Sequence, residues 1–207
     1  MVVTAGPTQE AIDPVRYISN HSSGKMGYAL AEQARALGAK VILISGPTVL
    51  TIPNGINLIA VETTNDMREA VKVHFAEADC LIMAAAPSDY RPHEVMSSKI
   101  KRTAGELTLE LEPTEDILKE VTLSRRKGQI VVGFALETND AIANARRKLK
   151  EKNLDLIVLN QPGSDSGFGT DTNRVTVIAP RSKPVKWPLA SKEEIAHRLL
   201  ELIGKML

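Results

Sequence analysis

The chain has 207 residues, and its 26 Lys and Arg against 25 Asp and Glu give a formal net charge of +1. This charge excludes an overall electrostatic attraction of the molecule to nucleic acid or anionic membranes. The length predicts one domain over residues 1–207, and the single cysteine, Cys80, excludes an internal disulfide and indicates a reducing compartment. Because no segment approaches the ~18 apolar residues of a membrane span and no signal-peptide pattern is present, we expect a cytoplasmic protein.

Short apolar segments alternate with longer amphipathic ones, a pattern typical of β-α-β units around a parallel sheet. Strands are expected at residues 1–5, 40–45, 56–60, 80–84, 129–134 and 154–159. Helices are expected at residues 25–37, 65–76, 115–126 and 138–151. Gly38 lies at a helix C-cap position and Thr64 at an N-cap position. The pattern predicts an α/β, mostly parallel, doubly wound sheet flanked by helices.

Residues 94–111 interrupt this alternation and predict an inserted β-hairpin around a turn at residues 103–105. Lys99 and Lys101 would share one face of a strand, so both ammonium groups could close over a bound triphosphate as parts of a lid. Arg102 adds a third positive charge. Charge on an edge strand also protects against aggregation, and this alternative stays open.

The C-terminal part begins with a Gly-, Ser- and Asp-rich stretch to residue 173, which predicts a long loop. Residues 175–178 and 183–187 are expected to form an antiparallel pair, and residues 191–203 a last helix.

Hydroxyl residues and glycine precede the first predicted helix as Ser22-Ser23-Gly24. Free backbone N–H groups and the helix dipole at such an end favour phosphate binding. The glycine spacing fits neither G-x-G-x-x-G nor a Walker A loop, and an ordinary helix cap is the alternative.

Three consecutive alanines, Ala84 to Ala86, end the predicted central strand and are followed by Asp89. Ligands bind at this edge of open α/β sheets, and alanines allow a flat ring or ribose to approach the backbone. Asp89 would bind Mg²⁺ or a ligand hydroxyl, or would be an ordinary turn residue.

Phe134 ends the fifth predicted strand, and Lys148 and Lys152 share one face of the following helix. Taken alone, the two lysines are typical of a solvated helix end. The four histidines are scattered without metal-ligand spacing, so we propose no zinc site.

Together these segments resemble the phosphopantothenoylcysteine synthetase (phosphopantothenate-cysteine ligase) family over essentially the whole chain. The resemblance rests on TAGPT at 4–8, DPVRYISNHSSGKMG at 13–27, the alanine run with DYR at 84–91, KIKR at 99–102, GFALET at 133–138, KxxxKNLD at 148–155 and GFGTDTN at 167–173. In bacteria such a domain is commonly the C-terminal half of a protein whose N-terminal half is a flavin-dependent decarboxylase. The first predicted strand begins at residue 1, so we expect a stand-alone enzyme or an excised domain.

The resemblance implies a Rossmann-like homodimer that joins L-cysteine to 4'-phosphopantothenate through an acyl-cytidylate, using CTP and Mg²⁺. It implies catalytic roles for Asn20 and Lys99, and Asp89 is the expected Mg²⁺ ligand. The expected nucleotide contacts are Ser22, Ser23, Gly24, Ala85, Asp89, Lys99, Glu115, Asp116, Ile117, Leu118, Phe134, Lys148 and Lys152. Arg16, Asn20 and Ala86 are the expected substrate contacts.

The sequence departs from the family pattern at three places. Pro87-Ser88 stands where the family often has Val-Ala, Thr172 interrupts a usual Asp-Asn-Asn, and Arg102 replaces a common lysine with a planar guanidinium group.

Two other functions compete with the ligase. An NAD(P)-dependent reductase is disfavoured by the missing G-x-G-x-x-G and by the lack of a compact Ser/Tyr/Lys set. A non-catalytic nucleotide-binding module would need neither a cationic hairpin nor Asn20.

Overall fold

The computed structural model describes residues 1–102, 105–137, 139–160 and 169–207, and in this part of the chain eight strands form one sheet, ordered β13-β12-β10-β9-β6-β1-β4-β5. The parallel strands are β1 (Val2–Ala5), β4 (Ile42–Ser45), β5 (Asn57–Ala60), β6 (Cys80–Met83), β9 (Ile130–Leu136) and β10 (Leu156–Asn160). Two antiparallel strands, β12 (Val175–Ile178) and β13 (Val185–Lys186), extend one edge. Because the strand order reverses between β1 and β6, the sheet is doubly wound and Rossmann-like, as predicted.

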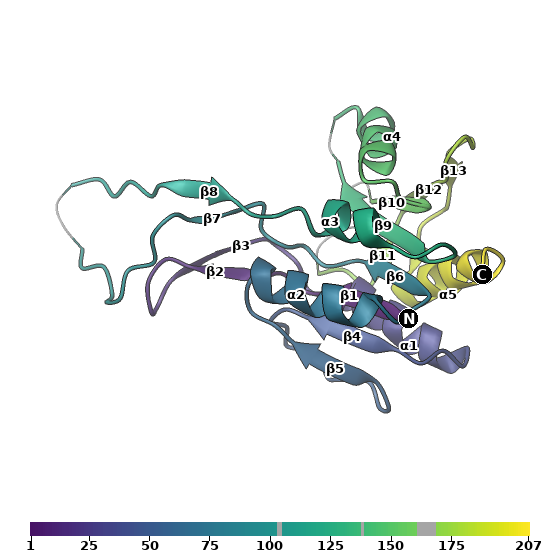
Figure 1. Ribbon diagram of the computed structural model, residues 1–207, viewed down its shortest axis with the longest axis horizontal. Helices are drawn as coiled ribbons and strands as arrows, with labels where there is room; N and C mark the ends of the chain where they lie inside the picture. The colour runs from purple at the N-terminus through teal and green to yellow at the C-terminus, as the bar shows by residue number, and fades with distance from the viewer. Residues whose placement is uncertain (103–104, 138, 161–168) are drawn as a thin grey trace.

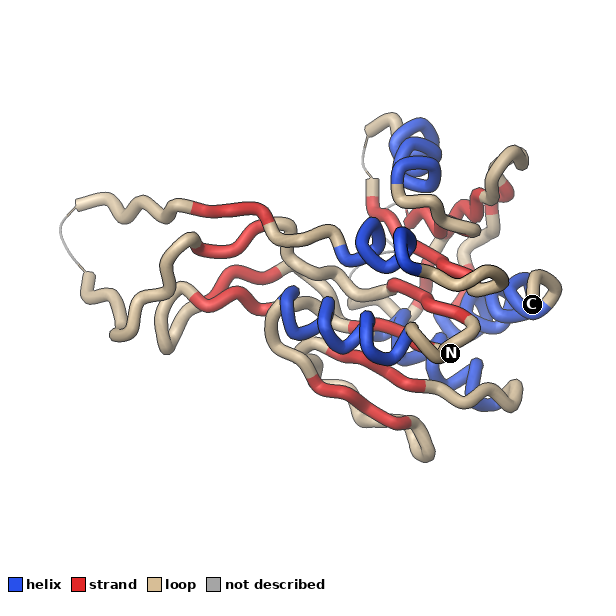
Figure 2. The backbone as a smooth tube through the Cα atoms, in the orientation of Figure 1, coloured by secondary structure: helices blue, strands red, loops and turns tan. Residues whose placement is uncertain are grey.

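Helices cover both faces of this sheet (Figure 2). Helices α1 (Lys25–Ala36) and α5 (Lys192–Gly204) pack on one face, and α2 (Thr64–Phe75), α3 (Ile117–Ser124) and α4 (Ala141–Glu151) on the other. The period of two in a strand divides the core accordingly: Val3 lies in the cluster under α1 and α5, while Val2 lies in the cluster under α2 and α3.

Two short antiparallel ladders form an arm that projects from the sheet (Figure 1). The first pairs β2 (Gln9–Ala11) with β3 (Tyr17–Ser19), and the second pairs β7 (Tyr90–Pro92) with β8 (Leu111–Pro113). A third small ladder joins β11 (Thr172–Asn173) to β14 (Ala190–Ser191) at the start of α5. The arm therefore consists of residues from two distant parts of the sequence.

An antiparallel pair is inserted between β6 and α3, as expected, but its strands lie at other residues than predicted. Paired strands occur at the base of the insertion, β7 and β8, rather than on either side of residues 103–105, two of which lie outside the described residues. The base is held by ion pairs from Glu112 to Arg91 (2.8 Å) and to His93 (2.9 Å). Lys99 and Lys101 therefore do not share a strand face, and the β2–β3 ladder was not predicted.

The N-cap of α2 also differs from the prediction. Thr63, not Thr64, caps the helix, in a capping box with Asp66. The side chain of Thr64 instead bonds to Thr8 (2.9 Å) and to the carbonyl of Ser88 (3.2 Å), inside the molecule. Gly38 follows the C-cap of α1 at a φ of 89°, as its position predicts. The expected start of α4 at Thr138 and residues 161–168 of the long loop lie outside the described residues.

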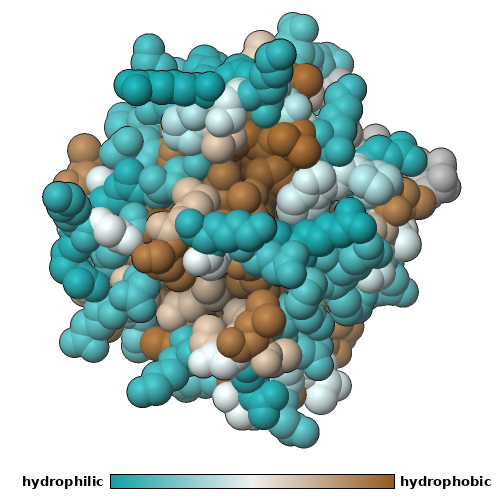
Figure 3. Space-filling model, turned by 90° about the vertical axis from the view of Figure 1, so that its right-hand side faces the viewer, coloured by the Kyte–Doolittle hydropathy of each residue, from teal (hydrophilic) through white to brown (hydrophobic). Residues whose placement is uncertain are grey.

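The end of the molecule opposite the arm carries apolar side chains at its centre, among hydrophilic ones (Figure 3). Exposed apolar residues near the ends of helices and at the C-terminus include Leu37, Leu123, Met206 and Leu207. Across the described residues, no helix combines the length and the apolar character needed to cross a membrane.

Candidate functional site

A cavity of about 500 Å³ lies where β6, β9 and β10 end, beside the N-terminus of α1. It is at the switch point of the sheet, where open α/β folds bind ligands. The sequence-predicted residues that line it are Asn20, Ser22, Ser23, Gly24, Ala85, Ala86, Asp89, Phe134 and Lys148. Arg16, Lys99, Glu115, Asp116, Ile117, Leu118 and Lys152 are not among its lining residues.

The N-terminus of α1 forms one wall of this cavity. Gly24 has a φ of 75°, and a Cβ on it would lie 2.7 Å from Cγ2 of Thr48. A Cβ on Gly27 would lie 2.5 Å from Cβ of Ala5, so this glycine lets the helix approach β1 closely. No described side chain caps the helix, and its first turn has no acidic residue. The helix dipole and first N–H groups therefore favour an anion in the cavity.

Asn20 also lines the cavity. Its Nδ2 donates to the carbonyls of Pro87 (2.9 Å) and Ala86 (3.3 Å), just beyond the end of β6. The N–H of Ala86 donates to the carbonyl of Gly6 (2.9 Å), which ties this segment to the end of β1. These two hydrogen bonds fix the orientation of the Asn20 amide, and therefore also the direction of its Oδ1.

Asp89 presents an exposed carboxylate to the cavity from a rigid turn. The preceding Ser88 is buried, and its N–H donates to Oγ1 of Thr8 (2.9 Å) while its carbonyl accepts from Oγ1 of Thr114 (2.6 Å). Within the described ranges, no group of three or more His, Cys, Asp or Glu side chains is arranged to hold a metal ion. A metal at Asp89 would therefore need ligands from a substrate.

Strand β9 and helix α4 also contribute to the cavity. Phe134 and Lys148 line it, and the ammonium group of Lys148 pairs with Glu137 at 2.6 Å. Lys152 lies outside the cavity, where it pairs with Asp116, the N-cap of α3, at 2.9 Å. Ile117 and Leu118 are buried core residues of α3. The structure thus places the 115–118 turn and Lys152 beside the cavity but not in its wall.

Lys99 and Arg16 lie on the arm. The residue after Lys99, Ile100, donates its N–H to Oδ2 of Asp13 (3.1 Å) and accepts a hydrogen bond from the Arg16 guanidinium. Burial alone would raise the pKa of Asp13, but the N–H groups of Ile100, Val15 and Arg16 outweigh it and lower the pKa. The arm segment around Lys99 is thereby bound to the β2–β3 turn, and Lys99 is exposed on it.

Five polar residues outside the predicted set also line the cavity: His21, Lys25, Asn160, Asn173 and Lys192. Oδ1 of Asn160 is buried and has no hydrogen-bond partner among the described residues. Lys192 is only 4% exposed; burial, and then the neighbouring Lys25, lower its pKa. Lys25 and Asn173 stand inside quoted motifs, but no sequence signal marks Lys192.

Cys80 lies in the core of β6, and burial raises the pKa of its thiol to about 12. A thiol with this pKa remains protonated at neutral pH and is a poor nucleophile. Its expected role as a core residue is confirmed.

Comparison with known proteins identifies the family. Residues 1–207 match the model of the DNA/pantothenate metabolism flavoprotein C-terminal domain. The chain belongs to this family. A solved member, the C-terminal domain of the coenzyme A biosynthesis bifunctional protein CoaBC, superposes with a TM-score of 0.85 at 42% identity, covering 99% of this chain and 93% of that one.

Curated relatives of the flavoprotein C-terminal domain are longer proteins. The coenzyme A biosynthesis bifunctional protein CoaBC of Bacillus subtilis (strain 168) is 49% identical over 208 residues, which cover 100% of this chain and 51% of the relative. A protein from an unknown prokaryotic organism, named cysteine/cysteine sulfinic acid decarboxylase, is 48% identical over 205 residues, or 97% of this chain and 56% of the relative. The chain thus spans about half the length of these relatives.

Proposed function

We propose that the chain is a phosphopantothenate-cysteine ligase, which joins L-cysteine to 4'-phosphopantothenate with a nucleoside triphosphate, through an acyl-nucleotide. The observation that carries the proposal is the cavity at the switch point. It places the N-terminus of α1, which no described side chain caps, in one cavity with Asn20 and Asp89, within a family whose relatives include a coenzyme A biosynthesis protein.

The reaction needs the substrate carboxylate held in line with the α-phosphorus, which positioned hydrogen-bond donors can provide. Because Nδ2 of Asn20 is engaged by two carbonyls, its Oδ1 is held in a defined direction. That oxygen can accept the hydrogen bond of the attacking cysteine amine, while the amide fixes the ends of β6 and the segment before α1 relative to each other. Asn20 would therefore position the acyl-nucleotide for amide formation.

Mg²⁺ fits the site as an ion held by a single carboxylate and substrate phosphates, the usual mode for this metal. Asp89 would supply that carboxylate, since it is exposed at the cavity and follows Ser88, whose backbone is hydrogen-bonded to the side chains of three threonines. The metal would neutralise phosphate charge during transfer.

CTP is the proposed nucleotide. Phe134 and Lys148 line the cavity, and the buried Oδ1 of Asn160 can accept from an amine or a hydroxyl. A cytosine presents an amine and a carbonyl edge that backbone groups and a lysine can recognise. Equal turnover with ATP and CTP at subsaturating concentration would refute this choice.

The test of the ligase is pyrophosphate release with CTP, phosphopantothenate and cysteine, with each component omitted in turn. We expect pyrophosphate only when CTP and phosphopantothenate are both present, and the amide only when cysteine is added. Hydride transfer from a nicotinamide cofactor, or nucleotide binding without turnover, would instead support one of the competing functions.

A dinucleotide reductase is disfavoured by the end of β4. Dinucleotide-binding folds of this type carry an acidic residue for the ribose about twenty residues after the glycine motif. Here Ser45 ends the strand and is buried, with its hydroxyl bonded to the carbonyl of Gly46 (2.8 Å). Any Cβ on Gly46 would collide with the carbonyl of Pro7, so this position is closely packed.

A further inference from the structure

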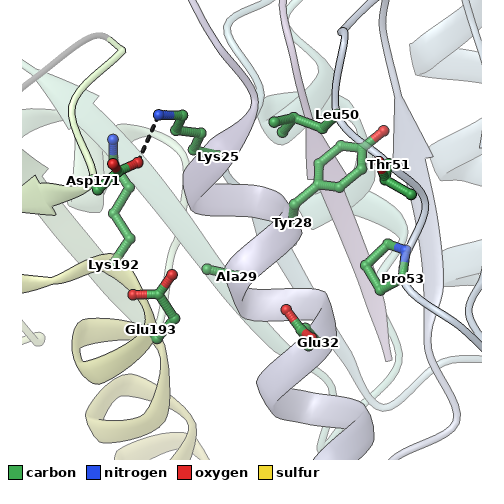
Figure 4. A pocket seen from close by; sticks show the side chains of 10 residues that line it. All are labelled: Lys25, Tyr28, Ala29, Glu32, Leu50, Thr51, Pro53, Asp171, Lys192 and Glu193. Carbon is green, nitrogen blue, oxygen red and sulfur yellow. Dashed lines mark hydrogen bonds and ion pairs between the residues drawn. The ribbon is translucent and has the colours of Figure 1, made fainter.

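Two lysines meet beside the α1 end of the cavity (Figure 4). Lys25 is the first residue of α1 and Lys192 the first residue of α5. Both line the 500 Å³ cavity described above, and both also border a second cavity of about 240 Å³ over the outer face of α1. The two lysines therefore lie between the candidate site and the smaller neighbouring cavity.

Both lysines hold the same short turn. Nζ of Lys25 donates to the carbonyl of Gly169 (2.9 Å) and pairs with Oδ1 of Asp171 (2.6 Å). Lys192 donates through Nζ to the carbonyl of Thr170, and through its backbone N–H to the carbonyl of Asp171 (2.9 Å). Within residues 169–171, Asp171 is the acidic side chain that lies beside the two cations.

Two features of this arrangement favour a bound anion. A cation at a helix N-terminus opposes the dipole, and burying an ammonium group costs free energy. The start of α5 has Glu193 and Glu194 to compensate, whereas the first turn of α1 has no acidic residue. An anion placed at this end of the cavity would relieve the repulsion between the two lysines.

Asp171 is suited to give way to such an anion. Its side chain is 83% exposed, while that of Lys25 is 32% exposed, so their ion pair lies in solvent and contributes little to stability. A polyphosphate oxygen offers Lys25 a stronger charge-assisted hydrogen bond than this exposed carboxylate.

We propose that Lys25 and Lys192 form a polyphosphate subsite that binds the β- and γ-phosphates of the nucleotide, with Asp171 as a displaceable counter-ion. The proposal rests on the ligase function above and orients the substrate in the cavity: phosphates at the α1 end and the base toward Phe134 and Lys148. When a carboxylate oxygen of phosphopantothenate attacks the α-phosphorus, the bond from that phosphorus to the bridging oxygen breaks. Pyrophosphate leaves with the electron pair, and the two ammonium groups stabilise its charge.

Inorganic pyrophosphate is the direct probe, because its binding can be measured by calorimetry without turnover. We expect Lys25→Met and Lys192→Met each to weaken pyrophosphate binding about tenfold or more, as expected for the loss of one charge-assisted contact. Lys205→Met, at the exposed C-cap of the same helix as Lys192, should leave the affinity unchanged. Unchanged affinity in both Lys25→Met and Lys192→Met overturns the subsite.

Asp171→Asn separates this role from a structural one. If Asp171 is a competing counter-ion, its neutralisation should tighten pyrophosphate binding about twofold to fivefold, the range that an exposed ion pair supports. If the pair merely holds the turn in place, the same change should leave the affinity unchanged or weaken it, and that result overturns the proposal.

Failure of the subsite and failure of the ligase function are distinguishable. Pyrophosphate binding that depends on both lysines, in a chain that forms no amide, would retain the subsite and reject the ligase. Amide formation in a chain whose pyrophosphate affinity does not depend on the two lysines would retain the ligase function and reject the subsite. Thermal unfolding of each variant checks the fold, and Lys25→Met carries the test if Lys192→Met does not fold, because the Lys25 side chain is partly exposed.

Discussion

Asn20 connects two segments that lie 66 residues apart, through its hydrogen bonds to the carbonyls of Ala86 and Pro87. Asn20→Asp replaces the donating amide by a carboxylate that faces the same two carbonyls. The ends of β6 and of the segment before α1 should then separate slightly, and an added negative charge lies near the anionic acyl-phosphate. The groups at α1 that are proposed to bind phosphate would remain in place, so acyl-nucleotide formation should persist while amide formation slows.

Quenched single-turnover reactions test this expectation by comparing acyl-nucleotide with amide. We expect Asn20→Asp to accumulate acyl-nucleotide, and Asn57→Asp, on the exposed edge strand β5, to behave as wild type. Normal amide yield without accumulation in Asn20→Asp would leave Asn20 as a structural link only.

The arm contains a pH-sensitive contact at the outer end of its second ladder. The hydrogen bond to Glu112, and then its charge, raise the pKa of His93 above the ordinary 6.5, and His93 followed by Arg91 lowers the pKa of Glu112. A raised histidine pKa stabilises the folded form below pH 6.5, and this contribution is lost as pH rises through the folded-state pKa. Since the His93 side chain is 66% exposed, solvent screening keeps the effect modest.

Hydrogen-exchange protection of β7–β8 amides, relative to those of β1 and β4, should therefore fall as the pH rises through the pKa of His93. His93→Gln should remove most of this pH dependence. Protection factors that stay constant with pH in the wild-type chain would contradict the expectation.

The segment before the arm tip offers three exposed trypsin sites, Lys99, Lys101 and Arg102. If Lys99 contacts nucleotide, CTP with Mg²⁺ should slow cleavage at these sites, because a bound phosphate would hold the lysine and shield its peptide bond. Cleavage at Lys127, on the exposed turn between α3 and β9, is the internal control and should not change. Equal cleavage rates at the arm with and without CTP would contradict a role for the arm in nucleotide binding.

Local patterns predicted the elements of the sheet but not the arm. The runs around Val3, Ile82 and Val132 are apolar on both sides because both sheet faces are covered, and such runs identify parallel strands. The arm strands are three residues long and depend on partners elsewhere in the chain: β2 also packs against β7, and Glu112 holds Arg91. Three residues carry too little periodicity to predict pairing of this kind.

The candidate site shows the same division between local and distant determinants. Ser22, Ser23 and Gly24 could be predicted because a helix N-terminus has its own sequence signature. Lys192 could not be predicted, because it reaches the cavity through the packing of α5 on α1 and through the β11–β14 ladder. It lies more than 160 residues from Lys25 in the sequence. Distance along the sequence thus limits which site residues can be predicted.

At the scale of the whole molecule, the arm is where a homodimer contact is expected. Its exposed apolar residues are Val15, Tyr17, Tyr90, Val95, Met96, Leu107, Leu109 and Leu111. An isolated two-stranded ladder is only marginally stable in water, and its edges can pair with another chain.

We therefore expect a dimer by sedimentation at micromolar concentration. Leu111→Asp should weaken it, whereas Leu123→Asp, an equally apolar and more exposed change on α3, should not. A monomeric wild-type mass would count against the dimer.

A dimer would also explain how Lys99 reaches a nucleotide, since this residue does not line the cavity of its own chain. In a two-fold dimer, the arm of one subunit could deliver Lys99 to the cavity of the other. Asn20→Asp and Lys99→Gln should each be inactive or severely slowed alone, the latter roughly a hundredfold for loss of one charge-assisted contact. Co-expressed, they should recover about a quarter of the wild-type rate, because half of the dimers are mixed and each mixed dimer has one intact site. If Lys99 acts instead on its own chain, every site in the mixture carries one defect, and no activity returns.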